Sequence, residues 1–247
     1  MTTSSRPAYA PAAPAPLEVR DAIDLLALVA QLEHTAFARM AADSALAPTL
    51  EQRLELSRLA ADAVSRRDRV LARVQELGGD PVTALRQYDD VLDEFDARTQ
   101  PSTWWERLLK VYVGYGVADD FCRLAAEALD PTSRELVLAV LDDASHAELA
   151  VAELDAAGSQ DGALSSRLAL WGRRIVGEAL SVVQGLLSQR PPLARLVQRA
   201  QQARTQSTNP DAPAPADAAP APVEGAKVFG ELTAQHTRRM SRLGLTA

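Results

Sequence analysis

The chain has 247 residues, of which 47% are apolar and only 4% aromatic, with one cysteine and a formal net charge of −7. A single cysteine excludes an internal disulfide and a cysteine-rich zinc site, so we expect a reduced, cytoplasmic protein. Alanine is abundant, whereas β-branched and aromatic residues are sparse, which favours helices over sheets. The most apolar segment, 169–187, contains Arg173, Arg174 and Glu178, so no membrane span is expected.

Two segments rich in proline and alanine lie on either side of the helical part. Residues 1–16 and 204–223 contain few core-forming side chains, so we predict a disordered N-terminal tail and a Pro/Ala linker. The linker leads into residues 224–247, where apolar side chains recur at helical spacing. This stripe predicts a C-terminal amphipathic helix that packs on the rest of the protein through Val228, Leu232, His236, Met240 and Leu243.

Between these segments the periodic pattern predicts six helices, over 17–46, 50–77, 104–129, 133–157, 164–188 and 193–203. Three of them begin at the sequence of a capping box, at Thr49, Thr103 and Thr132. Short connections around Pro48 and Pro131 predict two antiparallel hairpins. The link between the hairpins, 78–103, is long enough for a crossover and a short helix over 84–98.

The fold class that follows is all-α, a four-helix bundle with one long crossover plus two extra C-terminal helices. We place one helical domain at 17–203, with the core bundle at 17–157 and two basic helices at 163–203.

Charged residues interrupt the apolar seam of each bundle helix. They stand where a period of about 3.6 residues directs side chains into the core. An isolated buried charge costs several kcal/mol unless it is paired or binds a metal. Since His146 follows Asp143 by three residues, both side chains can reach one ion. Four interruptions at similar depth predict one shared site, formed by Glu33, Arg66, Asp120 and Asp143.

The order of these residues resembles that of ferritin-like di-iron proteins, which supply Glu, Glu-x-x-His, Glu and Glu-x-x-His from successive helices. Here Glu33, Asp120 and the segment Asp143-Ala144-Ser145-His146 match three of those four elements. With the segments LEHTAF, YVGYGVADDF, DDASHAELA and HTRRMSRLGL, the chain looks like an actinobacterial ferritin-like protein. That group resembles the tRNA hydroxylases that act on 2-methylthio-N6-isopentenyladenosine. The resemblance covers about residues 17–190 and implies a ferritin-like bundle with a metal site.

The second helix departs from the family pattern. Ala63 stands in the Glu position and Arg66 in the His position, so an intact di-iron site is not expected. One hypothesis is that Arg66 replaces the metal cation among the carboxylates, which makes the protein a non-catalytic structural or interaction module with no cofactor.

The alternative is a metal-dependent, oxygen-using hydroxylase or oxidase of the tRNA-hydroxylase-like type. In that case Asp62 turns inward as a substitute ligand, or a single iron or manganese ion is held by Glu33, Asp120, Asp143 and His146.

The charge is distributed unevenly along the chain. Residues 1–162 carry a net charge of −13, and residues 163–207 carry one of +6. A basic surface attracts phosphate, and the resemblance makes tRNA the natural candidate. The same arginines also suit ion pairs with carboxylates of the acidic bundle. The sequence is also compatible with a homodimer. The candidate tRNA contacts are Arg167, Arg173, Arg174, Arg195 and Arg199.

Overall fold

The computed structural model describes residues 16–142, 145–208 and 225–247. Within these ranges every regular element is a helix, which confirms the all-α prediction. The described helices include none with the length and apolar character that a bilayer crossing requires. The predicted N-terminal tail lies outside the described residues except for Pro16, and so does most of the predicted linker.

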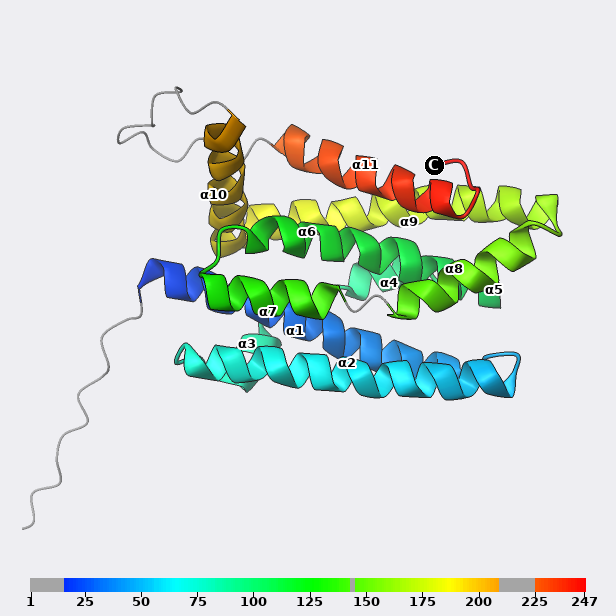
Figure 1. The fold of residues 1–247 in the computed structure, drawn as a ribbon, viewed down its shortest axis with the longest axis horizontal. Helices are drawn as coiled ribbons and strands as arrows, with labels where there is room; N and C mark the ends of the chain where they lie inside the picture. The colour runs from blue at the N-terminus through cyan, green and yellow to red at the C-terminus, as the bar shows by residue number, and fades with distance from the viewer. Residues whose placement is uncertain (1–15, 143–144, 209–224) are drawn as a thin grey trace, which may run out of the picture.

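Two helical hairpins form the bundle, as the sequence predicts (Figure 1). In the first, α1 and α2 pack along their whole length. In the second, each arm is divided into shorter helices, and the π-helix η1 lies between α5 and α6. The bounds are α1 Leu17–Ser44, α2 Leu50–Glu76, α5 Trp104–Lys110, η1 Val111–Tyr115, α6 Gly116–Ala126, α7 Pro131–Leu141 and α8 Ser145–Gly158.

Three of the six predicted helix starts are confirmed, and the other three helices, α7, α9 and α10, each begin two residues earlier than predicted. Thr49 forms a complete capping box with Gln52, and Thr103 accepts a hydrogen bond from the backbone N–H three residues on. The predicted start at Thr132 is wrong, because α7 begins at Pro131 with Asp130 as its N-cap, two residues before the predicted cap. The carboxylate of Asp130 accepts the backbone N–H three residues on, and the proline that follows it suits the first helical position.

The two divided arms correct the predicted continuous helices 104–129 and 133–157. In η1 the turn is wider than in an α-helix and takes up one extra residue, which rotates the following helix face by roughly 100°. The helix α7 ends at Leu141 with Asp142 as its C-cap, and the next described helix, α8, begins at Ser145. A constant period therefore does not describe the second hairpin.

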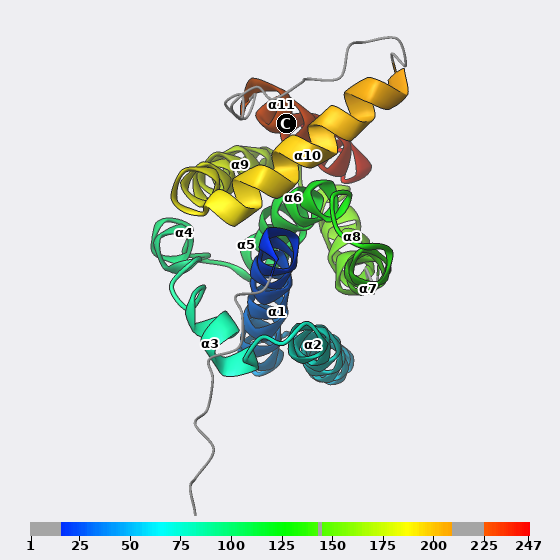
Figure 2. The same cartoon turned by 90° about the vertical axis from the view of Figure 1, so that its left-hand side faces the viewer.

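The crossover between the hairpins contains two short helices, α3 (Pro81–Arg86) and α4 (Asp93–Arg98), in place of the single helix predicted over 84–98. Helix α3 packs on α1 and α2, whereas α4 packs on α9. Figure 2 shows the crossover on the side of α1 away from α7 and α8. Its apolar anchors, Tyr88 and Phe95, are buried in the core.

Three more helices cover the second hairpin: α9 (Gly162–Gln189), α10 (Pro191–Thr208) and α11 (Gly225–Arg242). Helix α10 crosses the end of the bundle and continues to residue 208, so the predicted linker starts too early, at 204 (Figure 1). Helix α11 lies on α6 and α9. Its predicted apolar stripe is confirmed, because all five of its side chains are buried: Val228, Leu232, His236, Met240 and Leu243.

Candidate functional site

Helices α1 and α2 bring Glu33 and Arg66 together inside the first hairpin. The Nε atom of Arg66 lies 2.9 Å from Oε2 of Glu33, and their side chains are only 6% and 12% exposed. Both helices are regular, so the residues that the period directs inward do meet. The result is a buried, charge-assisted hydrogen bond between neighbouring helices.

The third bundle helix contributes Asp119 to this place, not Asp120. Asp119 lines the same small cavity as Glu33 and Arg66. Burial, with repulsion from the nearby carboxylate of Glu33 second, raises the pKa of Asp119 to about 7. Asp120 instead points to α11, where its Oδ1 lies 2.7 Å from Nη2 of Arg239. The extra residue in η1 moves the inward position from Asp120 to the buried Phe121 and turns Asp120 toward α11. Asp119 lines the cavity together with Val111 and Tyr115, each four residues from the next.

The cavity beside these residues has a volume of about 30 Å³, enough for one or two water molecules. Besides Glu33, Arg66 and Asp119, its wall includes Arg39 and Tyr115. The Arg39 guanidinium lies 5.3 Å from the centre of the Tyr115 ring. The Tyr115 hydroxyl is buried and, among the described residues, has no hydrogen-bond partner. Burial raises its pKa well above the usual range.

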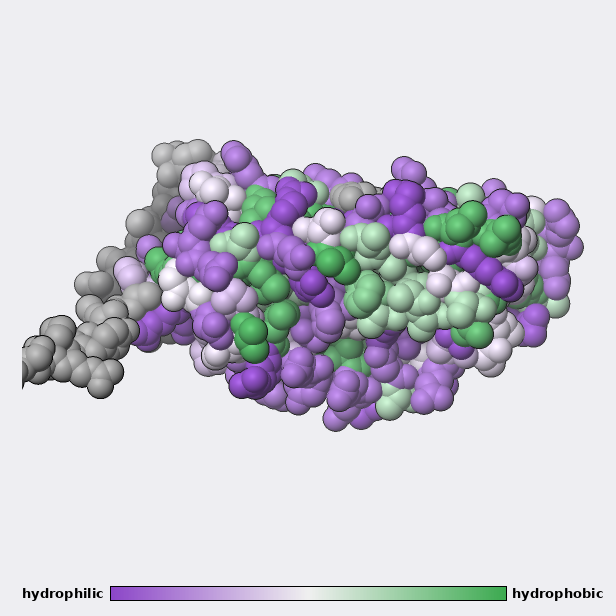
Figure 3. All heavy atoms as spheres, turned by 90° about the horizontal axis from the view of Figure 1, so that it is seen from below, coloured by the Kyte–Doolittle hydropathy of each residue, from purple (hydrophilic) through white to green (hydrophobic). Residues whose placement is uncertain are grey.

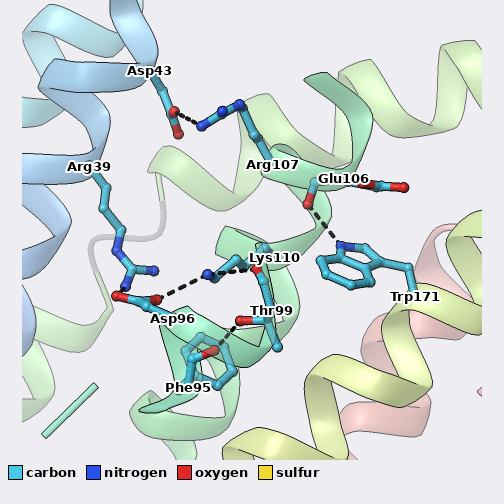
Figure 4. Close-up of polar contacts among 9 residues, drawn as sticks. All are labelled: Arg39, Asp43, Phe95, Asp96, Thr99, Glu106, Arg107, Lys110 and Trp171. Carbon is cyan, nitrogen blue, oxygen red and sulfur yellow. Dashed lines mark hydrogen bonds and ion pairs between the residues drawn. The ribbon is translucent and has the colours of Figure 1, made fainter. Parts of the chain in front are cut away.

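Arg39 also connects this cavity to the crossover (Figure 4). Its guanidinium pairs with Asp96 of α4, and the other carboxylate oxygen of Asp96 lies 3.0 Å from Nζ of Lys110. The same Nζ donates a hydrogen bond of 2.8 Å to the backbone oxygen of Thr99. Burial, together with the neighbouring positive charges of Arg39 and Arg107, lowers the pKa of Lys110 to about 8. Asp96 therefore fastens the crossover to both bundle hairpins.

Two further contacts in Figure 4 hold the start of α5 in place. Arg107 donates to Asp43 of α1 at 2.9 Å, and the indole N–H of Trp171 on α9 donates to the backbone oxygen of Glu106 at 3.2 Å. The helix that leads into η1 is thus anchored on two sides. In both contacts the donor has an acceptor within the protein, so these polar groups have a structural role.

The described side chains of the cavity do not fit a divalent metal ion. Helix α2 supplies a guanidinium instead of ligands, and Arg39 adds a second positive charge. No group of three or more histidine, cysteine, aspartate or glutamate side chains is placed to hold a metal within the described part of the chain. Asp143 lies outside the described residues, and of His146 the structure describes only the helical backbone.

The five arginines considered for tRNA separate into two groups. Arg195 and Arg199 of α10 bind the fully buried Asp21 of α1, at 3.1 and 3.0 Å. The other three are exposed on α9, where Arg174 also stacks 5.8 Å from the centre of the Trp171 ring: Arg167, Arg173 and Arg174. Only the α9 group presents guanidinium to solvent without such an internal carboxylate partner among the described residues.

Sequence reasoning missed Arg39, Tyr115 and Asp119. The signal that could have revealed them is the pair of glycines, Gly114 and Gly116, inside a helical pattern, since glycine in a helix interior often marks irregular geometry or close packing. A Cβ at Gly114 would lie 2.8 Å from Cζ of Phe95, and one at Gly116 would clash with the guanidinium of Arg239. These close approaches occur where η1 changes the helical register.

Comparison with known families agrees with this architecture. The family described as "Ferritin-like domain, actinomycetes" matches residues 18–200, which extend from α1 into α10. A search of curated proteins found none with significant similarity to the chain. The family match confirms the ferritin-like resemblance over most of the sequence. The chain therefore belongs to the family of ferritin-like domains of actinomycetes.

Proposed function

We propose that this protein is a ferritin-like bundle with a degenerate metal site, in which the guanidinium of Arg66 replaces the metal, and that it acts as a non-catalytic structural or interaction module. The observation that carries the proposal is the buried pair between Arg66 and Glu33. Arg66 stands on the helix that would otherwise supply a Glu-x-x-His pair.

Electrostatics favours this exchange. Carboxylates that converge in a core need a counter-charge, because burial and mutual repulsion otherwise protonate them. Arg66 offers five donors in a fixed plane, and Arg39 approaches the same cavity from α1. A divalent ion placed here would meet two fixed positive charges in a low dielectric. The arginines thus supply the neutralisation that metal provides in a metal-binding bundle.

An interaction role is supported by exposed apolar side chains at the end of the first hairpin. Leu46, Leu50 and Leu54 are each more than half exposed. Figure 3 shows hydrophobic residues, in green, among hydrophilic ones over both halves of this face, including the half that holds the α1–α2 turn. Leu50 and Leu54 lie one turn apart on α2, and exposed apolar side chains that lie together mark protein interaction sites. A second copy of the chain is the partner we propose to test first, by measuring the mass of the full chain in solution with Leu50→Glu/Leu54→Glu as the comparison.

Metal binding by the untagged full chain tests the central claim. We expect the purified wild type to hold no stoichiometric iron or manganese, and its melting temperature to be unchanged by a chelator. The double variant Ala63→Glu/Arg66→His restores the missing pair and should bind ferrous iron. The matched control is Val64→Glu/Arg67→His, which places the same two side chains one residue further along α2, on a different face, and should bind none.

The opposite result would support the alternative function. Stoichiometric metal in the wild type, released by the chelator with a fall in melting temperature, would contradict the replacement of metal by Arg66. It would favour the single-metal hydroxylase or oxidase of the tRNA-hydroxylase-like type. The α9 arginines would then be the first residues to test for contact with tRNA.

A further inference from the structure

A groove separate from the bundle site runs between the crossover and α9. Its volume is about 390 Å³, within the range of small-molecule sites. Figure 2 shows α4 beside α9, and the two helices are in contact. The wall of the groove comes from residues 88–98 on one side and 178–190 on the other. None of the ion pairs of the bundle cavity lies in it.

The floor of this groove is apolar. Four side chains line both the groove and a second cavity beneath it, of about 30 Å³, whose wall is almost entirely apolar. One of them, Phe95, packs directly against Gly114. A Cβ atom at position 114 would leave no room for the Phe95 ring. The shared residues are Val91, Phe95, Val182 and Leu186. Phe95 and Leu186 are already buried, so a hydrocarbon chain or ring placed in the groove would remove mainly the half-buried Val91 and Val182 from water.

The rim of the groove is acidic. Its two cationic side chains already have internal partners. Arg98 binds Glu94 at 3.0 Å and Glu178 at 3.4 Å, and Arg190 lies 4.6 Å from the centre of the Tyr88 ring. Two further carboxylates at the rim, Asp90 and Asp93, are exposed and have no ion-pair or hydrogen-bond partner among the described residues. The Tyr88 ring does not cancel the charge of Arg190, but the groove holds four carboxylates against two guanidinium groups, so its rim carries net negative charge.

We propose that this groove binds a small amphiphile whose apolar chain or ring lies on the floor and whose ammonium head meets Asp90 and Asp93. An anionic head would face like charge, and a purely apolar molecule would leave the carboxylates without a partner. The assignment is independent of the role proposed for the bundle site, since no residue carrying that role lines the groove.

Calorimetric titration of the full chain with three probes of equal tail length tests the ligand class. The probes are octylammonium, octanol and octanoate, each below its aggregation threshold. We expect octylammonium to bind one to one and at least about tenfold more tightly than octanol, a difference of about 1.4 kcal/mol. Octanoate should bind most weakly, and added salt should reduce the difference. Equal binding of octanoate and octylammonium would overturn the charge assignment.

The position of the ligand is tested with two glycines of α9 at which an added Cβ meets no atom within 4 Å. Gly185 lines the groove, whereas Gly177 does not. Gly185→Trp fills the groove and should weaken octylammonium binding at least about tenfold, while Gly177→Trp should bind as the wild type. Wild-type affinity in a folded Gly185→Trp variant would overturn the proposal.

A third comparison does not depend on the tryptophan variant folding. Asp90→Asn/Asp93→Asn changes only exposed side chains and should remove most of the preference for octylammonium over octanol. Asp89→Asn alters an adjacent exposed carboxylate outside the groove and should leave that preference unchanged. An undiminished preference in the double variant would place the ammonium head elsewhere and overturn the proposal.

Discussion

The two hairpins of the bundle differ in how closely they follow a regular helix. The first consists of uninterrupted helices of 28 and 27 residues, and its two inward charges meet as a constant period predicts. The second contains a π-helix and a break after Leu141, and there the expected Asp120 turns away from the site. A periodic pattern thus locates a buried residue only while the helical pitch stays constant.

The π-helix also gives two adjacent acids different roles. Asp119 faces the bundle cavity, and Asp120 binds Arg239 of the C-terminal helix. The same segment receives Phe95 from the crossover and Arg239 from α11 against its two glycines. The irregular hairpin is therefore the one that holds the crossover and α11, while the regular hairpin holds the central ion pair.

The largest effect is expected in the regular hairpin. Arg66→Leu removes the guanidinium from the buried Glu33 carboxylate and should lower the free energy of unfolding by roughly 3–5 kcal/mol, measured by urea denaturation. Arg67→Leu is the control, because Arg67 binds the exposed Asp68 and its loss should cost less than about 1 kcal/mol. Similar small losses in both variants would show that the central pair contributes little to stability.

Docking of α11 on the irregular hairpin should depend on pH through His236. Its ring is 2% exposed, and burial, with repulsion from Arg239 second, lowers its pKa to about 4. Because the folded-state pKa lies below the ordinary value of 6.5, the stability is complete above that pH and falls as pH decreases toward 4.

The resulting loss should be on the order of 3 kcal/mol across that interval. It is measured as the difference in unfolding free energy between the wild type and His236→Leu at about pH 7 and about pH 4. His34→Gln, which changes an exposed histidine of α1, should keep the full wild-type dependence. If His236→Leu also keeps it, the buried ring is not the titrating group.

A smaller effect is expected from adding a methyl group at Gly114, which lies in the π-helix η1. Gly114→Ala places a methyl group against Phe95 and should reduce the unfolding free energy by about 1–3 kcal/mol. Gly177→Ala adds the same methyl group where nothing lies within 4 Å, and should be neutral or stabilise by up to about 1 kcal/mol. Equal stabilisation by both variants would mean that the crossover does not need this close approach.

The smallest effect is expected for Asp120, and it tests whether this side chain faces Arg239 of α11 or the bundle cavity. Asp120→Asn weakens a half-buried ion pair and should cost about 1 kcal/mol in unfolding free energy. In a double-mutant cycle its effect should couple to Arg239→Leu and not to Arg66→Leu. Coupling to Arg66 instead would place Asp120 in the bundle cavity, as the uninterrupted period predicts.

Local sequence determined which segments are helices and where several of them begin. The Thr49 capping box, the apolar stripe of α11 and the Ala63/Arg66 departure are all readable from the chain, because capping and periodicity depend on residues a few positions apart. The same locality made the inward positions of the first hairpin predictable. The start of α7 also depends on local sequence, because Asp130 caps the helix and Pro131 follows it, although the capping-box pattern at Thr132 indicated a later start.

Only the tertiary structure decided which partners those residues meet. Arg195 and Arg199 bind Asp21 across 174 and 178 residues of chain. Asp120 binds Arg239 of α11, and it is Asp119 that lines the bundle cavity. No local pattern encodes such contacts, since their free energy comes from surfaces that meet only after the chain has folded. The family pattern located the site on the helices, and the packing around η1 selected the side chains that enter it.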